Sequence, residues 1–97
     1  MDEGSFIWDE EKHILNIKKH KITFIEATTV FDDINALIIA DPDHSQDEER
    51  FIIIGFSENA KLLIVCHCYL SNDSIIRIIS ARKANRKERK SYGSREK

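Results

Sequence analysis

Cationic side chains gather at the end of the chain, in the stretch IIRIISARKANRKERKSY at residues 75–92. Residues 77–97 carry nine Lys or Arg against two Glu, a net charge of +7. Residues 1–76 carry six against fifteen Asp or Glu, a net charge of −9, so the chain as a whole is at −2. Clustered cations beside a rigid strand attract polyanions. We therefore expect this end of the chain to bind a polyanion, and RNA is the one we favour.

Three of these cations stand in or directly after the last apolar segment. Arg77 lies among Ile75 and Ile79. A guanidinium held partly out of water stabilises a phosphate more strongly than one in bulk solvent. Arg82 and Lys83 stand where the segment ends, so alternation sends their side chains to opposite faces unless the strand has already stopped. The three together are candidates for binding the phosphate of a scissile bond.

Two histidines are candidates for proton transfer, because the ordinary pKa of a histidine lies near neutrality. His20 follows Lys19 at the end of a predicted helix, where positive charge also compensates the helix dipole. His67 stands between two cysteines in a predicted strand, where a histidine is more often part of the packed sheet than a catalyst.

The cations also have interpretations without chemistry. A run of charge usually forms the solvated face of a helix, which would explain the basic residues after Ala84. Arg77 fits equally well as a structural ion-pair partner of Glu26 or Asp32. Both alternatives stay open on the sequence.

The spacing of apolar residues predicts the elements that position these groups. Asp9 and Thr23 are suitable helix N-caps, and Glu26 completes a capping box with Thr23. Apolar residues recur at helical spacing after each cap, whereas later segments are alternating or continuously apolar. We expect helices after Asp9, after Thr23 and from about Ala84, and strands over residues 4–8, 36–40, 50–56, 62–70 and 75–81.

The connections between the last strands are short and favour antiparallel hairpins, because a parallel crossover needs a dozen or more residues. Alternation over residues 62–70 places Cys66 and Cys68 on one face of the sheet and His67 and Tyr69 on the other. The predicted fold is α+β, in the order β-α-α-β-β-β-β-α: a small, mainly antiparallel sheet with two N-terminal helices and a C-terminal helix. We expect one domain over residues 1–97, with flexible ends at 1–4 and 93–97.

Composition excludes several classes of protein. Ninety-seven residues suffice for a single core. No apolar run approaches the roughly 20 residues that span a bilayer, and the acidic N-terminus is unlike a secretory signal. Cys66 and Cys68, two apart in one predicted strand, are badly placed for a disulfide. We therefore expect a cytoplasmic protein without membrane contact or cofactor.

The acidic segment DPDHSQDEE at residues 41–49 raises the question of a metal site, because hard cations bind carboxylate oxygens. Its spacing lacks the glycine and terminal glutamate of an EF-hand loop, and alternation turns His67 away from the cysteines. We predict no metal. Glycine-rich phosphate loops, G-x-S-x-G and H-E-x-x-H are also absent, which leaves nucleotide hydrolysis, esterase and zinc-protease chemistry unsupported.

Three segments resemble the BrnT toxin family and cover nearly the whole chain in order. FIWDEEKHILNIKKHKITFIEATTVFDD resembles the pattern F-x-W-D-x-x-K-x-x-x-N-x-x-K-H-x-I/V-x-F-x-E-A. EERFIIIGFSENAKLLIVCHCY resembles the family's E-E-R…G-x-S segment, and RIISARKANRKER its R-I-I-S-A-R-K-A-x-x-x-E-R signature. The positions that match are Trp8, Asp9, Lys12, Asn16, Lys19, His20, Phe24, Glu26, Arg50, Gly55, Ser57, Arg77, Ser80, Arg82, Lys83, Glu88 and Arg89.

The resemblance implies a small bacterial type II toxin, a ribonuclease with a RelE-like fold that blocks translation by cutting RNA without a metal. It implies two partners, an RNA substrate and a BrnA-like ribbon-helix-helix antitoxin through which operator DNA is contacted. One position departs from the pattern: Leu70 stands where we expect relatives to carry a basic residue after the tyrosine.

We combine the residue chemistry with this resemblance in one hypothesis. Arg77 and Arg82 would brace the scissile phosphate, and Lys83 and Lys19 would hold flanking phosphates. His20 or His67 would move a proton. The alternative is a non-catalytic basic module that binds nucleic acid or a partner protein. The residues that we expect to bind RNA around the site are Lys12, Lys19, Arg50, Tyr69, Arg86 and Arg89.

Overall fold

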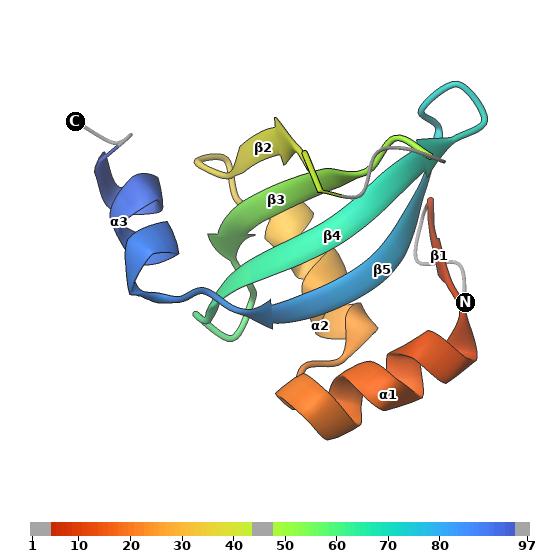
Figure 1. Ribbon diagram of the computed structural model, residues 1–97, viewed down its shortest axis with the longest axis horizontal. Helices are drawn as coiled ribbons and strands as arrows, with labels where there is room; N and C mark the ends of the chain where they lie inside the picture. Colours follow the sequence, from red (N-terminus) through yellow and green to blue (C-terminus); the bar gives the residue numbers. More distant parts are fainter. Residues whose placement is uncertain (1–4, 44–47, 95–97) are drawn as a thin grey trace.

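The computed structural model describes residues 5–43 and 48–94 and joins one sheet to three α-helices (Figure 1). The element order and the α+β class confirm the prediction from the sequence. In chain order the elements are β1 (Phe6–Trp8), α1 (Glu10–His20), α2 (Phe24–Thr29), the 3₁₀ turn η1 (Val30–Asp32), β2 (Leu37–Ala40), β3 (Phe51–Phe56), β4 (Leu62–Leu70), β5 (Ile75–Lys83) and α3 (Arg86–Ser94).

The five strands lie in the order β1-β5-β4-β3-β2. Only β1 pairs in parallel, with β5; the other neighbours are antiparallel, as the short connections between β3, β4 and β5 predict. One face of the sheet, here the helix-covered face, packs against α2 and the residues around it (Figure 1). The opposite face, here the open face, carries α3 at one end only, against Ile54, Leu62 and Ile64.

The core on the helix-covered face follows from the alternation of the strands. Leu63, Val65 and Ile78 are buried there against Phe24 and Val30 of the helical segment. Burial of such side chains contributes roughly 1.5–3 kcal/mol each. The alternation predicted for β4 is therefore confirmed: one set of its side chains meets the helices, and the other set, with Cys66 and Cys68, faces the opposite way.

Two element boundaries differ from the prediction at the cationic end of the chain. β5 continues two residues further, because Ile64 and Leu63 of β4 still pair with Arg82 and Lys83. α3 begins later, after Asn85, whose side chain accepts a hydrogen bond from the Glu88 amide at 2.8 Å while Glu88 accepts one from the Asn85 amide. This reciprocal capping box fixes the start of α3. The predicted flexible ends lie largely outside the described residues, although α3 runs through Ser94.

β5 contains a bulge that changes which side chains share a face. Its pairing with β4 shifts between Cys66 and His67, and Ile79 is left without a partner. Strict alternation would put Arg77 and Arg82 on opposite faces, because they are five residues apart. The extra residue brings both to the open face, in the pairs Arg77–Cys68, Ser80–Cys66 and Arg82–Ile64.

Asn16 of α1 fixes the strand next to this bulge. β1 pairs with β5 only as far as Ile78, so the backbone of Ala81 has no strand on that side. The Asn16 side chain accepts from the Ala81 amide at 3.0 Å and donates to its carbonyl at 2.8 Å. It also donates to the carbonyl of Ile22 at 2.9 Å and is itself buried. The Asn16 side-chain amide therefore satisfies the two backbone groups of Ala81 that a neighbouring strand would otherwise pair with, and it joins α1 to β5.

Both cysteines are free thiols on the open-face side of β4. Burial, the largest effect, together with the nearby Asp41 carboxylate, raises the pKa of Cys66 to about 11, so the thiol stays protonated at neutral pH. No helix in residues 5–43 and 48–94 combines the length and apolarity needed to cross a bilayer.

Candidate functional site

A groove crosses the edge of the sheet where β5 lies beside α1. It consists of two adjoining pockets, of ≈ 300 Å³ and ≈ 190 Å³, which share Ile79 and Ser80 at the bulge. We call them the arginine pocket and the lysine pocket, and together the β5 groove. The other lining residues are Asp41, Asp43, Arg50, Ile52, Ile64, Cys66 and Arg82 in the arginine pocket, and Lys12, Leu15, Asn16, Lys19 and His20 in the lysine pocket.

Arg82 is held in a fixed orientation at the groove by Glu88 of α3. Its Nη1 and Nη2 donate to the two carboxylate oxygens of Glu88 at 2.9 and 2.8 Å. These hydrogen bonds raise the pKa of Arg82 and lower that of Glu88. A guanidinium has five N–H donors, and Nε makes no hydrogen bond within the described part of the chain. Arg82 is therefore preoriented, with donors left for a second anion.

Arg77 and Arg50 share one carboxylate on the same face. Nη2 of Arg77 donates to both oxygens of Glu48 at 2.7 Å, and Nε of Arg50 donates to the same group at 3.1 Å. Burial works to raise the pKa of Glu48, but the two guanidinium groups outweigh it and lower that pKa. The structural ion pair considered for Arg77 thus exists, but with Glu48 and not with Glu26 or Asp32.

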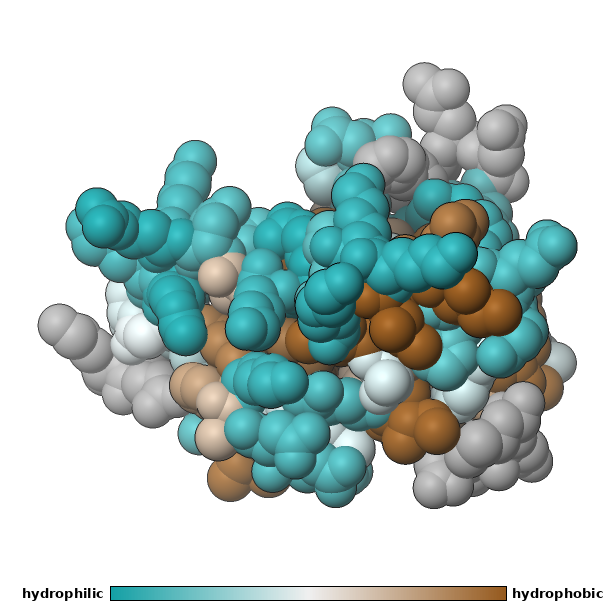
Figure 2. Space-filling view, turned by 90° about the horizontal axis from the view of Figure 1, so that it is seen from below, coloured by the Kyte–Doolittle hydropathy of each residue, from teal (hydrophilic) through white to brown (hydrophobic). Residues whose placement is uncertain are grey.

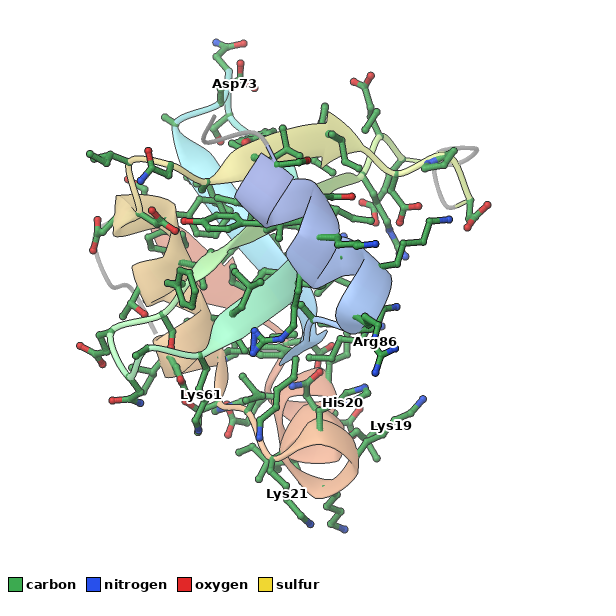
Figure 3. All side chains as sticks on the ribbon, turned by 90° about the vertical axis from the view of Figure 1, so that its left-hand side faces the viewer. Lys19, His20, Lys21, Lys61, Asp73 and Arg86 are labelled. Atoms are coloured by element: carbon green, nitrogen blue, oxygen red, sulfur yellow. The ribbon has the colours of Figure 1, made fainter. Side chains whose placement is uncertain are left out.

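His20 ends α1 among cations. Burial, the charge of Lys19 and the charge of Arg82 all lower its pKa, which places Arg82 close enough to act on the ring electrostatically. The imidazole is therefore neutral at pH 7 and able to accept a proton. In Figure 3, Lys19 and His20 at the end of α1 and Arg86 at the start of α3 lie on the same side of the molecule.

His67 does not reach the groove. It lies on the helix-covered face, is 0% exposed and packs edge-on against Phe31, with ring centroids 4.9 Å apart. Its Nε2 is 3.1 Å from the hydroxyl of Tyr69, and burial lowers its pKa. RNA has no access to such a side chain, which corrects the expectation that His67 is an alternative to His20. Tyr69, expected to bind RNA, instead partners His67 and lines a different pocket.

The remaining predicted cations lie outside the β5 groove. Lys83 pairs with Leu63, so its side chain leaves the strand on the side away from Arg82. β5 continues through both Arg82 and Lys83, so their side chains point to opposite faces, as the sequence predicts for an unbroken strand. Arg86 and Arg89 are exposed on α3, where they form a solvated basic surface. The structure thus brings Arg82, Arg50, Lys12, Lys19 and His20 together, with Arg77 joined to them through Glu48.

A third pocket, of ≈ 370 Å³, has the wrong charge for a polyanion. Glu48, Glu49 and Asp73 line it, together with Tyr69 and Leu70. Leu70 therefore faces this acidic pocket, and its departure from the family pattern removes no cation from the β5 groove. Residues 5–43 and 48–94 contain no group of three or more His, Cys, Asp or Glu arranged to hold a metal. Residues 44–47 of the acidic segment lie outside the described residues.

Three contributors to the site were not predicted as such. Ser80 is part of the family pattern, but its residue type alone indicates no role, and its place between the two pockets depends on the bulge. The N-x-x-E spacing from Asn85 to Glu88 marks a capping box and so could have placed Glu88 at the start of α3, but it gives no signal for the pairing of Glu88 with Arg82. The bulge at Ile79 has no local sequence signal that we can identify.

Comparison with known proteins identifies the family to which the chain belongs. A family model described as "Ribonuclease toxin, BrnT, of type II toxin-antitoxin system" matches residues 8–88. The fold is similar to the crystal structure of the Brucella abortus ribonuclease toxin BrnT, with a TM-score of 0.61 and 23% sequence identity, covering 84% of this chain and 96% of that one. No curated protein matches the sequence. Since the family match extends over most of the chain, this protein belongs to the BrnT family of ribonuclease toxins from type II toxin–antitoxin systems.

Proposed function

We propose that the chain is a metal-independent endoribonuclease, that the β5 groove is its active site, and that it inhibits translation by cutting RNA. The observation that carries this proposal is the bulge at Ile79, because it puts Arg77 and Arg82 on one face beside the groove. Membership of a ribonuclease family favours this reading over a non-catalytic basic module.

RNA supplies its own nucleophile, so the groove needs only to position the RNA, transfer a proton and stabilise the charge that develops on the phosphate. The 2′-hydroxyl attacks the adjacent phosphorus, the 5′ oxygen leaves, and a 2′,3′-cyclic phosphate forms. Neutral His20 takes the proton of the 2′-hydroxyl, and the leaving oxygen takes one from solvent. Arg82 donates to the non-bridging oxygens as their negative charge grows. Lys12 and Lys19 hold the neighbouring phosphates.

The ion pairs of the free protein are part of this proposal. Glu88 holds the plane of the Arg82 guanidinium without using all of its donors. Glu48 likewise orients the guanidinium of Arg77. In the described part of the chain only Nη2 of Arg77 donates to Glu48, so its other N–H donors are not used by that carboxylate. Each carboxylate reduces the net charge of the site, so substrate binding also depends on the contacts that Lys12 and Lys19 of the lysine pocket make with neighbouring phosphates. This explains why the cations reach beyond the arginine pocket.

The family implies an antitoxin as the protein partner. We propose a BrnA-like ribbon-helix-helix protein that covers the β5 groove and contacts operator DNA itself. Covering the groove would exclude RNA from Arg82 and His20 at once. The toxin then needs no DNA-binding surface of its own.

Cleavage of a labelled RNA by purified toxin in EDTA tests the proposal. We expect the wild-type protein to cut under these conditions and Arg82→Ala to lose roughly 10²–10³-fold in rate, since it removes a donor aimed at the developing charge. Lys87→Ala, an exposed cation on α3 outside the groove, is the matched control and should cut at the wild-type rate.

Arg82 also anchors α3, so a lower rate has to be separated from unfolding. Thermal unfolding of Arg82→Ala and Arg82→Lys shows whether the fold survives, and Arg82→Lys should restore part of the rate because the charge remains. A requirement for a divalent ion, or full cleavage by folded Arg82→Ala, would contradict the proposal.

A further inference from the structure

The helix beside the groove turns apolar side chains toward solvent. Leu15 is 64% exposed, Ile14 is 47% exposed, and Ile17 is also exposed. Single exposed apolar residues are ordinary, but three within one turn of a helix form a patch. Figure 2, which views the molecule from the side where α1 lies in Figure 1, shows apolar side chains set among hydrophilic ones. We call Ile14, Leu15 and Ile17 the α1 patch.

The α1 patch is continuous with the β5 groove. Leu15 lines the lysine pocket, and it also lines a shallow surface hollow of ≈ 360 Å³ with Glu11 and Ile14. Since Leu15 belongs to both, a single extended or helical segment lying along α1 can touch the patch and enter the groove.

The charges around the α1 patch indicate which kind of segment could bind there. Lys12, Lys18, Lys19 and Lys21 are exposed on α1 and directly after it, and none pairs with a carboxylate within the described ranges. Their ammonium groups attract negative charge. RNA supplies negative charge but does not match the apolar residues Ile14 and Leu15. A polypeptide with apolar and acidic side chains matches both.

We propose that the α1 patch is the docking site of the antitoxin, through an acidic amphipathic segment. Apolar side chains of the segment cover Ile14 and Leu15, and its carboxylates pair with Lys12 and Lys19 and continue into the β5 groove. The inference rests on the proposed function in one respect, that the groove it blocks is the one that binds RNA.

Calorimetric titration of the purified toxin with its purified antitoxin tests the docking site. Ile14→Asp should weaken binding on the order of tenfold or more, as truncation of a buried interface anchor does. RNA cleavage should stay unchanged, because Ile14 does not line the groove. Ile34→Asp is the matched control: Ile34 is 94% exposed between η1 and β2, and its replacement should leave antitoxin binding unchanged.

The outcomes separate this inference from the proposed function. Binding of Ile14→Asp within twofold of wild type, or equal losses for Ile14→Asp and Ile34→Asp, would overturn the docking site whatever the toxin does to RNA. Absence of RNA cleavage by the wild type would contradict the proposed function and leave the binding result as it is. Thermal unfolding of both variants confirms that each is folded.

Discussion

The protonation state of His20 follows from its neighbours. The ring is partly buried at the end of α1, and the charges of Lys19 and Arg82 lower its pKa further below the usual 6.5. The imidazole is therefore neutral over the physiological range, which is the form that the proposed role as a base requires. In the proposed mechanism the cations that would hold phosphate also keep this ring neutral, so RNA binding and proton transfer would depend on one cluster.

A pH profile tests this assignment. Because the deprotonated ring is the active form, the cleavage rate should fall as the pH drops through the lowered pKa of His20, below 6.5. His20→Gln should lose about 10²–10⁴ in rate and should also lose that acidic limb. The assay is cleavage of a labelled RNA from pH 4.5 to 8. An unchanged acidic limb in His20→Gln would assign the titration to another group.

Residue types alone indicated which side chains were candidates for the site, but they did not indicate which of those side chains are buried. Arg82, Lys19 and His20 could be chosen from charge and ordinary pKa alone, and the structure places all three at the groove. His67 and Tyr69 were also candidates, although a histidine in such a strand is more often part of a packed sheet, and the two partner each other on the helix-covered side. Burial depends on which face packs against the helices, and a single residue does not carry that information.

At the scale of elements, α1 and β5 form the site by direct contact. Asn16 joins them with two hydrogen bonds to the backbone of Ala81, and a third hydrogen bond, to the carbonyl of Ile22, fixes the segment after α1. This contact holds α1, whose residues line the lysine pocket, against β5 beside the bulge. α3 contributes from the other end, through the capping box that aligns Glu88 with Arg82.

Removal of the Asn16 amide should loosen this joint. Asn16→Ala deletes three buried hydrogen bonds and leaves the Ala81 amide unsatisfied, so we expect the free energy of unfolding to fall by about 2–4 kcal/mol. Chemical denaturation measures the change. Asn59→Ala, in the exposed turn before β4, is the control and should cost less than about 0.5 kcal/mol. Equal losses in the two variants would refute the role of Asn16.

Element types and order were predictable, but the register within β5 was not. Apolar spacing, caps and short connections gave the helices and strands with small boundary errors. The shift at Ile79 arises from pairing with β4, a long-range interaction that leaves no local pattern. For this reason the sequence supported Arg77 and Arg82 as candidates without indicating that they share a face.

At the scale of the whole molecule, the cations at the end of α1 lie away from the acidic pocket, whereas the arginines of the sheet have carboxylates beside them: Glu48 pairs with Arg77 and Arg50, and Asp41 and Asp43 line the arginine pocket. The acidic pocket that includes Asp73 lies at the far end of the molecule from Lys19, His20 and Arg86 (Figure 3). Such polarity orients a polyanion before contact and repels it from the wrong end. The sequence predicted the polarity from its charge distribution, but the basic end divides into two surfaces, the β5 groove and the solvated side of α3.

The most direct test is to locate RNA on the protein by NMR. Amide and guanidinium shifts are followed while a short RNA with 2′-deoxyribose at the scissile position, which cannot be cut, is added. We predict that the largest changes fall on Ser80, Arg82, Lys19 and His20. Changes confined to Arg86, Lys87, Arg89 and Lys90 on α3, with the β5 groove unaffected, would contradict the account.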